Sequence, residues 1–149
     1  MSEAETAAFL AGERVMTCAT IGPGGRPHLM PLWYLLDGKT LLAWTFAKSQ
    51  KARNIERLPQ ATLQVEAGRG YQELRGVMLE CDVEMIRDLE AVTAIGRGLA
   101  VRYADAGGPA GPAAERDAAI AKQAPKRVGL RFHPTHVVSW DHRKISGAS

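Results

Sequence analysis

The sequence has few cysteines and no long hydrophobic run, and each shortage excludes a class of protein. Only two cysteines occur in 149 residues, and they lack the paired spacing and the neighbouring histidines of a metal site. Cys18 and Cys81 each fall in an apolar, strand-like run, so we expect free, buried, reduced thiols. No apolar run approaches the roughly 20 residues that span a bilayer. Residues 1–5 are acidic and unlike a signal peptide. We therefore expect a cytoplasmic protein with no membrane partner.

Familiar catalytic sets are also missing from the sequence. It shows no Ser-His-Asp set, no paired carboxylates and no metal cluster, so the protein itself is expected to do little acid–base chemistry. His133 and His136 flank an expected turn and are interpreted as structural. A barrel that binds single-stranded nucleic acid needs aromatic residues interleaved with cations. Trp33 and Trp44 stand in apolar strands without such cations, which argues against a nucleic-acid partner.

Composition and turn signals predict one soluble, mainly β domain over residues 1–149. The chain has 46% hydrophobic and 23% charged residues, which is typical of a folded domain. Hydrophobic patterning predicts strands at 14–21, 28–36, 40–46, 61–67 and 71–86, and a final pair at 128–132 and 137–140. It predicts helices at 3–12, 49–58, 89–104 and 113–123, and a mobile loop at 105–112. Since the first three strands are joined by short turns, the fold class is mainly β with peripheral α-helices.

The predicted strand at 28–36 combines two signals. It is nearly continuous in apolar residues, which indicates cover on both faces. Pro31 inside it cannot donate to a sheet ladder, so the strand must lie at an edge or contain a bulge. The Asp37-Gly38 pair that follows predicts a tight hairpin turn into the next strand.

The most informative segment leads from the strand at 40–46 into the helix at 49–58, whose first turn is cationic. A helix N-terminus carries the positive pole of the helix dipole and favours acidic residues. Lys48, Lys51 and Arg53 are easier to explain if an anion, most simply a phosphate, binds at that end.

Periodicity gives Lys51 two possible roles. Lys51 shares one helical face with Ile55 and Leu58, and we expect that face to be buried. Its ammonium then either extends along the surface to solvent or points into a cleft and holds the anion. Ser49 suits both interpretations, because serine is a good N-cap residue and also a donor to phosphate.

Four segments resemble, in order, the opening hairpin, ring-side strand, phosphate-binding turn and closing strands of one family. These segments are 14–21 with 28–36, Pro31-Leu32-Trp33, Thr45 with 48–54, and 128–134 with 137–140. The family is the flavin- and deazaflavin-binding split β-barrel family, which includes pyridoxamine 5′-phosphate oxidase and the F420-dependent reductases. The resemblance implies a six- or seven-stranded antiparallel split β-barrel of Greek-key type. It also implies a homodimer with cofactor sites at the subunit interface.

The resemblance further implies which residues form the site. Those that would hold the cofactor phosphate are Lys48, Ser49, Lys51 and Asn54. Those that would lie along the ring or its polyol chain are Pro31, Trp33, Trp44 and Thr45, although the tryptophans also suit barrel core or dimer interface. Trp140 of the partner subunit would reach the substrate. From position alone, Tyr71 and Arg75 are candidates to donate a proton or orient the substrate.

One departure from the family pattern bears on the cofactor. The flavin-using oxidases carry an arginine and a lysine on the ring-side strand, and residues 29–36 contain neither. An apolar ring-side strand with a lysine-rich phosphate helix resembles the F420-dependent branch. The implied function is an F420-dependent oxidoreductase that transfers a hydride between the reduced deazaflavin and a small conjugated electrophile. An FMN-dependent oxidoreductase of the same family and a non-catalytic F420- or FMN-binding protein remain alternatives.

Overall fold

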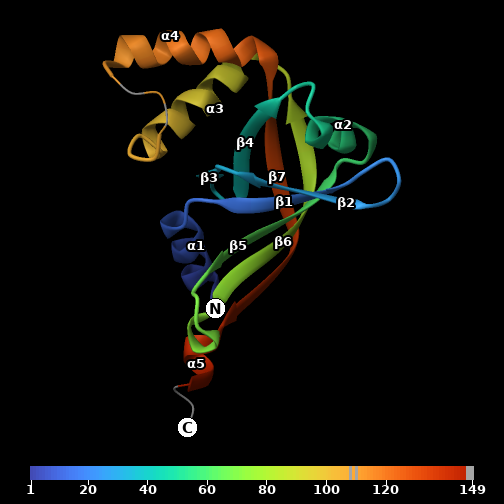
Figure 1. The fold of residues 1–149 in the computed structure, drawn as a ribbon, viewed down its shortest axis with the longest axis vertical. Helices are drawn as coiled ribbons and strands as arrows, with labels where there is room; N and C mark the ends of the chain where they lie inside the picture. Colours follow the sequence, from blue (N-terminus) through green and yellow to red (C-terminus); the bar gives the residue numbers. More distant parts are fainter. Residues whose placement is uncertain (108, 110, 147–149) are drawn as a thin grey trace.

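The centre of the protein is one antiparallel sheet that curls into a half-barrel (Figure 1). The computed structural model describes residues 1–107, 109 and 111–146. Its seven strands follow the order β2-β1-β5-β6-β7-β4-β3. They are β1 Met16–Ile21, β2 Pro27–Leu32, β3 Leu35–Asp37, β4 Thr40–Phe46, β5 Gln60–Ala67, β6 Arg75–Ile86 and β7 Arg127–Asp141. The antiparallel barrel with peripheral helices is therefore confirmed.

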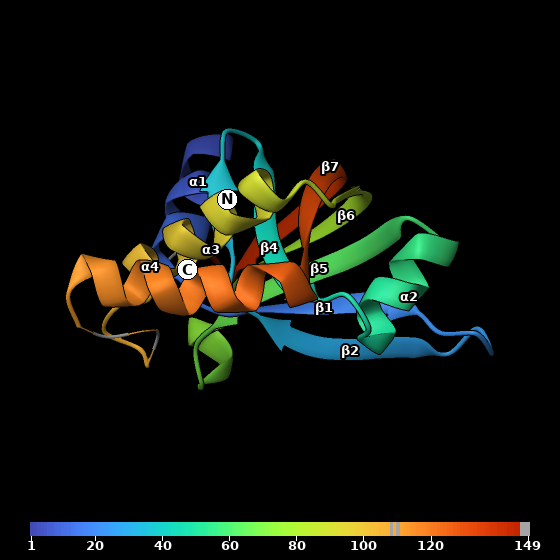
Figure 2. The same ribbon diagram turned by 90° about the horizontal axis from the view of Figure 1, so that it is seen from above.

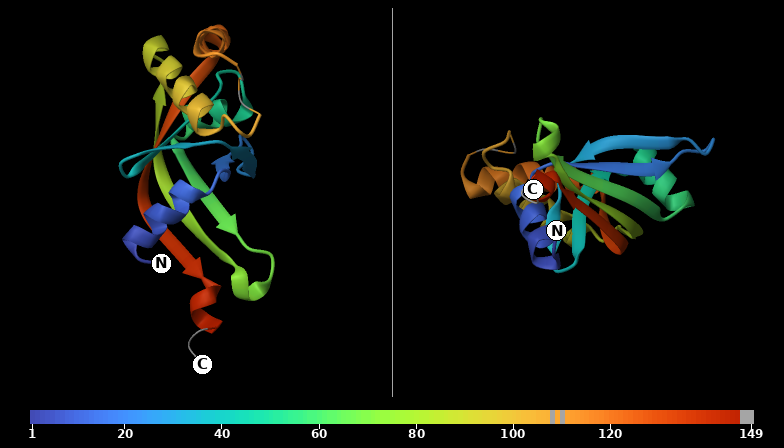
Figure 3. Two further views of the ribbon diagram at one scale, coloured as in Figure 1. Left: turned by 90° about the vertical axis from the view of Figure 1, so that its left-hand side faces the viewer. Right: turned by 90° about the horizontal axis from the view of Figure 1, so that it is seen from below.

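The helices lie outside the sheet, most of them near its two ends. They are α1 Glu3–Gly12, α2 Gln50–Arg57, α3 Leu89–Arg102, α4 Ala113–Gln123 and α5 His142–Ser146, with short 3-10 turns η1 Tyr71–Glu73 and η2 Ala124–Lys126. Figures 1 and 2 place α3 and α4 on one side of β4 and α2 on the other. Figure 3 shows β6 and β7 running side by side from the end of the sheet near α3 and α4 toward α5. No helix in the described residues has the length and apolar character needed to cross a bilayer.

Strand alternation builds the core inside the half-barrel. Along β1 the residues alternate between buried and half-buried positions, and Cys18 is fully buried. Both cysteines are free and buried, as predicted. Burial raises the pKa of the Cys18 thiol to about 11 and that of Cys81 to about 12. Both thiols are therefore protonated at neutral pH.

The predicted strand at 28–36 is instead two strands, β2 and β3, separated at Trp33 and Tyr34. The backbone of Tyr34 is bonded by side chains of α3 rather than by a neighbouring strand. Its N–H donates to the Tyr103 hydroxyl at 3.1 Å, and its carbonyl accepts from the Arg102 guanidinium at 2.6 Å. These tertiary bonds interrupt the sheet ladder.

Strand β2 lies at one edge of the sheet, as Pro31 requires. The expectation that both faces are covered is wrong within one chain. Leu29 and Met30 are 60% and 45% exposed. The apolar run marks a surface that a single chain leaves open rather than a strand buried in its own core.

Two further predictions change, and one falls partly outside the described residues. The final strand pair is the single strand β7, and the expected turn at 133–136 is absorbed as a bulge opposite Glu80 and Cys81. A bulge accommodates Pro134, which has no N–H for the ladder. β6 begins at Arg75, since Tyr71–Glu73 is a 3-10 turn. Within the predicted loop at 105–112, residues 108 and 110 lie outside the described residues.

Candidate functional site

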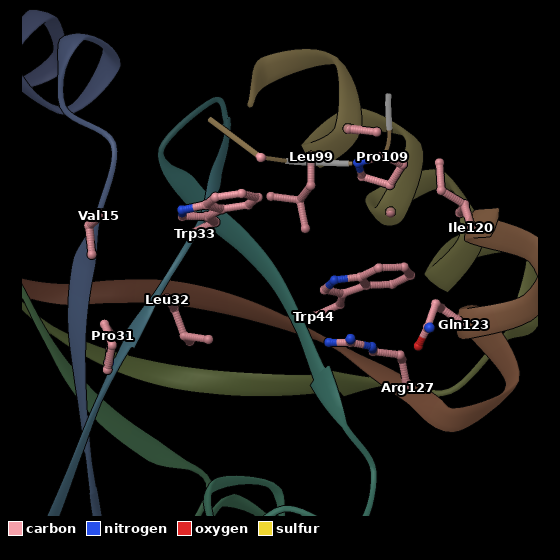
Figure 4. Close-up of a pocket in the computed structure, with 13 residues that line it drawn as sticks. Val15, Pro31, Leu32, Trp33, Trp44, Leu99, Pro109, Ile120, Gln123 and Arg127 are labelled. Carbon is pink, nitrogen blue, oxygen red and sulfur yellow. The ribbon is translucent and has the colours of Figure 1, made fainter. Parts of the chain in front are cut away.

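A cleft of about 560 Å³ lies between the sheet and helices α3 and α4 (Figure 4). Its walls are mainly apolar and include Pro31, Leu32, Trp33, Trp44, Leu99 and Ile120. The volume falls in the range of roughly 300–1,000 Å³ that is usual for small-molecule sites. Three residues predicted to lie along a cofactor ring, Pro31, Trp33 and Trp44, therefore line one cavity.

Trp33 is fixed in the cleft wall by α3. Its ring stacks on Tyr103 with centroids 4.4 Å apart and planes 7° from parallel. Tyr103 is fully buried, and its hydroxyl lies 2.7 Å from the Arg14 carbonyl, to which it can donate. Because the supporting ring is buried and hydrogen-bonded, the indole of Trp33 is held in one orientation.

Trp44 is confined between helix and strand. An ideal Cβ on Gly96 of α3 would lie only 2.5 Å from the Trp44 ring, so glycine is needed for this close approach. The Arg127 guanidinium carbon lies 4.7 Å from the Trp44 ring centroid and 4.0 Å from that of Phe46. Both distances suit cation–π contact.

Arg127 is the polar feature of the cleft that the sequence reasoning missed. It lines the cavity, and its Nε is buried without a hydrogen-bond partner among the described residues. Burial lowers the pKa of the guanidinium from its ordinary value. A buried donor without an acceptor is costly, and Arg127 is the charged residue among those that line the cavity.

Lys51 lies on the other side of β4, beneath the first turn of α2. Its side chain is buried, at 6% exposure, and its Nζ donates to Thr45 Oγ1 at 3.3 Å. Among the residues that the structure describes, no carboxylate forms an ion pair with it. Burial lowers the pKa of Lys51, and the positive charge of Arg127 lowers it further. The ammonium is thus the buried rather than the solvated alternative, and the described residues supply no anion to match it.

The helix start around Lys51 follows the predicted local chemistry. Ser49 is the N-cap, and its hydroxyl accepts from the Ala52 N–H at 3.1 Å and lies 3.4 Å from Thr45 Oγ1. Lys48 is exposed on the preceding turn. Leu58 is 38% exposed, contrary to expectation, because it is the C-cap and its extended backbone leaves the helical face.

Asn54 lies under α2 and serves as a tie to the sheet. It is fully buried, donates to Thr20 Oγ1 at 3.1 Å and accepts from Gln50 Nε2 at 2.7 Å. The bond to Thr20 holds α2 against β1, and the bond from Gln50 links Asn54 to the first turn of the helix.

The predicted site residues thus form two groups on opposite faces of β4. Neighbouring strand residues point to opposite faces, so Trp44 faces the cleft while Thr45 faces Lys51. The two groups interact electrostatically, since Arg127 lowers the pKa of Lys51. Both groups lie close to the end of β4, which is followed in the chain by α2.

Tyr71 lies in η1, which contacts α5, and Trp140 lies one residue before the end of β7, where α5 begins. Figure 1 shows α5 at the opposite end of the sheet from α3 and α4. Tyr71 is 75% exposed, with its ring 4.7 Å from that of His142. Trp140 packs over Gly76, where a Cβ would lie 2.4 Å from its ring. Arg75 lies over the Phe9 ring at 5.7 Å. A substrate role for any of them would require a second subunit.

The geometry can now be compared with known proteins. The family model of pyridoxamine 5′-phosphate oxidase matches residues 2–141. The chain belongs to this family. The resemblance inferred from the ordered motifs is therefore confirmed. No curated protein sequence matches the chain.

Solved structures support the same assignment. The conserved hypothetical protein Rv2991 from Mycobacterium tuberculosis is 40% identical, with 98% of this chain and 88% of that chain covered and a TM-score of 0.86. An F420 reductase is 25% identical, with 88% of this chain and 94% of that chain covered and a TM-score of 0.68. A FAD-binding protein from Mesorhizobium loti is 18% identical, with 93% of this chain and 94% of that chain covered and a TM-score of 0.68. At this identity the likeness shows the fold alone.

Proposed function

We propose that the protein is an F420-dependent oxidoreductase that reduces a small conjugated electrophile. The observation that carries the proposal is Lys51, a buried cation beside the N-terminal turn of α2 that forms no ion pair with any described residue. Burial of an unpaired charge is unfavourable, and a bound phosphate would offset that cost. The 25% identity to an F420 reductase supports the choice of cofactor.

The residues present fit such a cofactor. Lys51, Ser49 and exposed Lys48 surround the turn where a phosphate would bind. The cleft beyond the end of β4 offers flat apolar walls, Trp33 and Trp44, for a tricyclic ring. When bound, the reduced cofactor would supply a hydride to the electrophile, and one proton would complete the reduction. The protein's own contribution is to bind, orient and exclude bulk water.

We further propose that the working unit is a homodimer. The apolar edge strand β2 exposes Leu29 and Met30, and β7 exposes Val137 and Val138. A second copy that covers β2 would remove this surface from water and border the cleft at Pro31.

The test is calorimetric titration of the purified protein with F420 and, separately, with FMN. Micromolar binding of F420 and much weaker binding of FMN support the proposal. Preference for FMN would move the assignment to a flavin-dependent oxidoreductase, and binding of neither would refute the anion site. Oxidation of the reduced cofactor by added acceptors then separates an enzyme from a protein that only stores the cofactor.

A further inference from the structure

The cleft carries one cation that the cofactor phosphate site does not use. Arg127 lies with the side chains of Trp44 and Phe46 on the cleft side of β4. Lys51 contacts Thr45, whose side chain points to the opposite side of the same strand. A phosphate held at the first turn of α2 by Lys51 therefore leaves the Arg127 guanidinium facing the cavity.

We infer that Arg127 recognises a carboxylate on the acceptor, so that the substrate class is planar, conjugated carboxylic acids. That the ligand is an electron acceptor rests on the proposed function. That a carboxylate binds beside Arg127 rests on the structure of the cleft alone. A guanidinium presents parallel N–H donors that match the two oxygens of a carboxylate. Arg127 lines the cavity with its guanidinium over Trp44 and Phe46, and its Nε has no hydrogen-bond acceptor among the described residues.

The rest of the cleft is apolar and suits flat molecules, and an acceptor would share it with the cofactor ring that the proposed function places against the same tryptophans. Trp33 and Trp44 present aromatic rings to the cavity, and both are held by packing, against Tyr103 and Gly96. None of the described residues that line the cavity is acidic, and Gln123 adds a neutral amide near Arg127 (Figure 4). A molecule with a conjugated body and one anionic end matches this distribution of surface and charge.

The inference is tested on the cofactor-free protein with a matched pair of probes, 2-naphthoate and the neutral 2-naphthamide. Calorimetry should show that the wild-type protein binds naphthoate at least tenfold more tightly than naphthamide, because a hydrogen bond to a charged group is worth roughly 10- to 150-fold in affinity. Arg127→Gln should remove this preference. Arg127→Lys keeps the charge and loses the parallel N–H donors, so its preference for naphthoate should lie between those of the wild type and Arg127→Gln.

The matched control is Arg131→Gln. Arg131 lies on the same strand and the same face, but it pairs with Asp37 at 2.8 Å outside the cleft. The Arg131→Gln variant should bind both probes with wild-type affinity. Thermal unfolding of each variant shows that the comparison is made on folded protein. Equal affinity of the wild type for the two probes, or an unchanged preference in Arg127→Gln, would overturn the inference.

F420 titration of the same variants separates this inference from the proposed function. If the proposed function alone fails, the wild type binds naphthoate through Arg127 but does not bind F420. If this inference alone fails, F420 binds while the carboxylate preference is absent or insensitive to Arg127.

Discussion

Replacement of Lys51 by methionine should change cofactor affinity and protein stability in opposite directions. Lys51 is buried, with one hydrogen bond to Thr45 and no ion pair among the described residues. Methionine keeps a similar volume and removes the charge. The variant therefore isolates what the ammonium does in a nearly unchanged cavity.

The expected loss of affinity follows from the contact that the ammonium would make with the phosphate. A hydrogen bond to a charged group contributes about 1.5–3 kcal/mol, so the dissociation constant for F420 should rise roughly 10- to 150-fold.

The expected gain in stability follows from the lowered pKa of Lys51. Burial disfavours the charged form in the folded state, so at neutral pH the ammonium destabilises the cofactor-free fold. Its removal sacrifices one long hydrogen bond of about 1 kcal/mol or less and relieves a larger desolvation cost. The free energy of unfolding of the cofactor-free protein should therefore rise by about 1 kcal/mol.

The assays are urea unfolding at pH 7 and calorimetric titration with F420. The control is Lys39→Met, an exposed lysine in the turn between β3 and β4, which should leave both quantities within about 0.5 kcal/mol of the wild type. Wild-type F420 affinity in Lys51→Met would remove the phosphate role. A loss of stability by more than about 1 kcal/mol would show that the ammonium has a protein partner that offsets its burial.

Four further outcomes are expected. Because the pKa of Lys51 is lowered from 10.5, its charge is lost as pH rises through the lowered value; F420 affinity should fall in that range, and should stay constant in Lys51→Arg. Gly96→Ala forces a Cβ against Trp44, so urea unfolding should show a loss of about 1–3 kcal/mol and calorimetry weaker naphthoate binding. Arg102→Ala removes donors to the Tyr34 carbonyl and the end of α1, with an expected loss of about 2–3 kcal/mol in unfolding free energy. Leu29→Glu places a charge on the exposed apolar edge, and light scattering should report a monomer where the wild type is a dimer.

Elements whose signals are local were predicted closely from the sequence. Helix α2 begins after its N-cap Ser49 and ends before Pro59, within one residue of the prediction at each end. The cap, the missing acidic residues of the first turn and the burial of Lys51 all follow from a few neighbouring residues.

The wrong boundaries have causes that lie far away in the sequence. The break between β2 and β3 depends on Arg102 and Tyr103, which bond the backbone of Tyr34 across 68 and 69 positions. The bulge that keeps Pro134 inside β7 depends on the partner strand β6. Neither cause leaves a pattern in the residues next to the break or the bulge.

The same distinction explains why Lys51 was found and Arg127 was not. Lys51 conflicts with its own helix, because a cation stands where the dipole favours an anion. Arg127 conflicts with nothing nearby, since a cation at the first residue of a strand, next to Lys126, is ordinary at a protein surface. Its significance arises only when β7 pairs with β4, places it opposite Phe46 and lays the guanidinium over Trp44. Binding sites assembled by cross-strand register are therefore visible in the fold rather than in the sequence. Lys51 and Arg127 lie on opposite faces of β4, and they can be assigned to different anions only because the strand order is known.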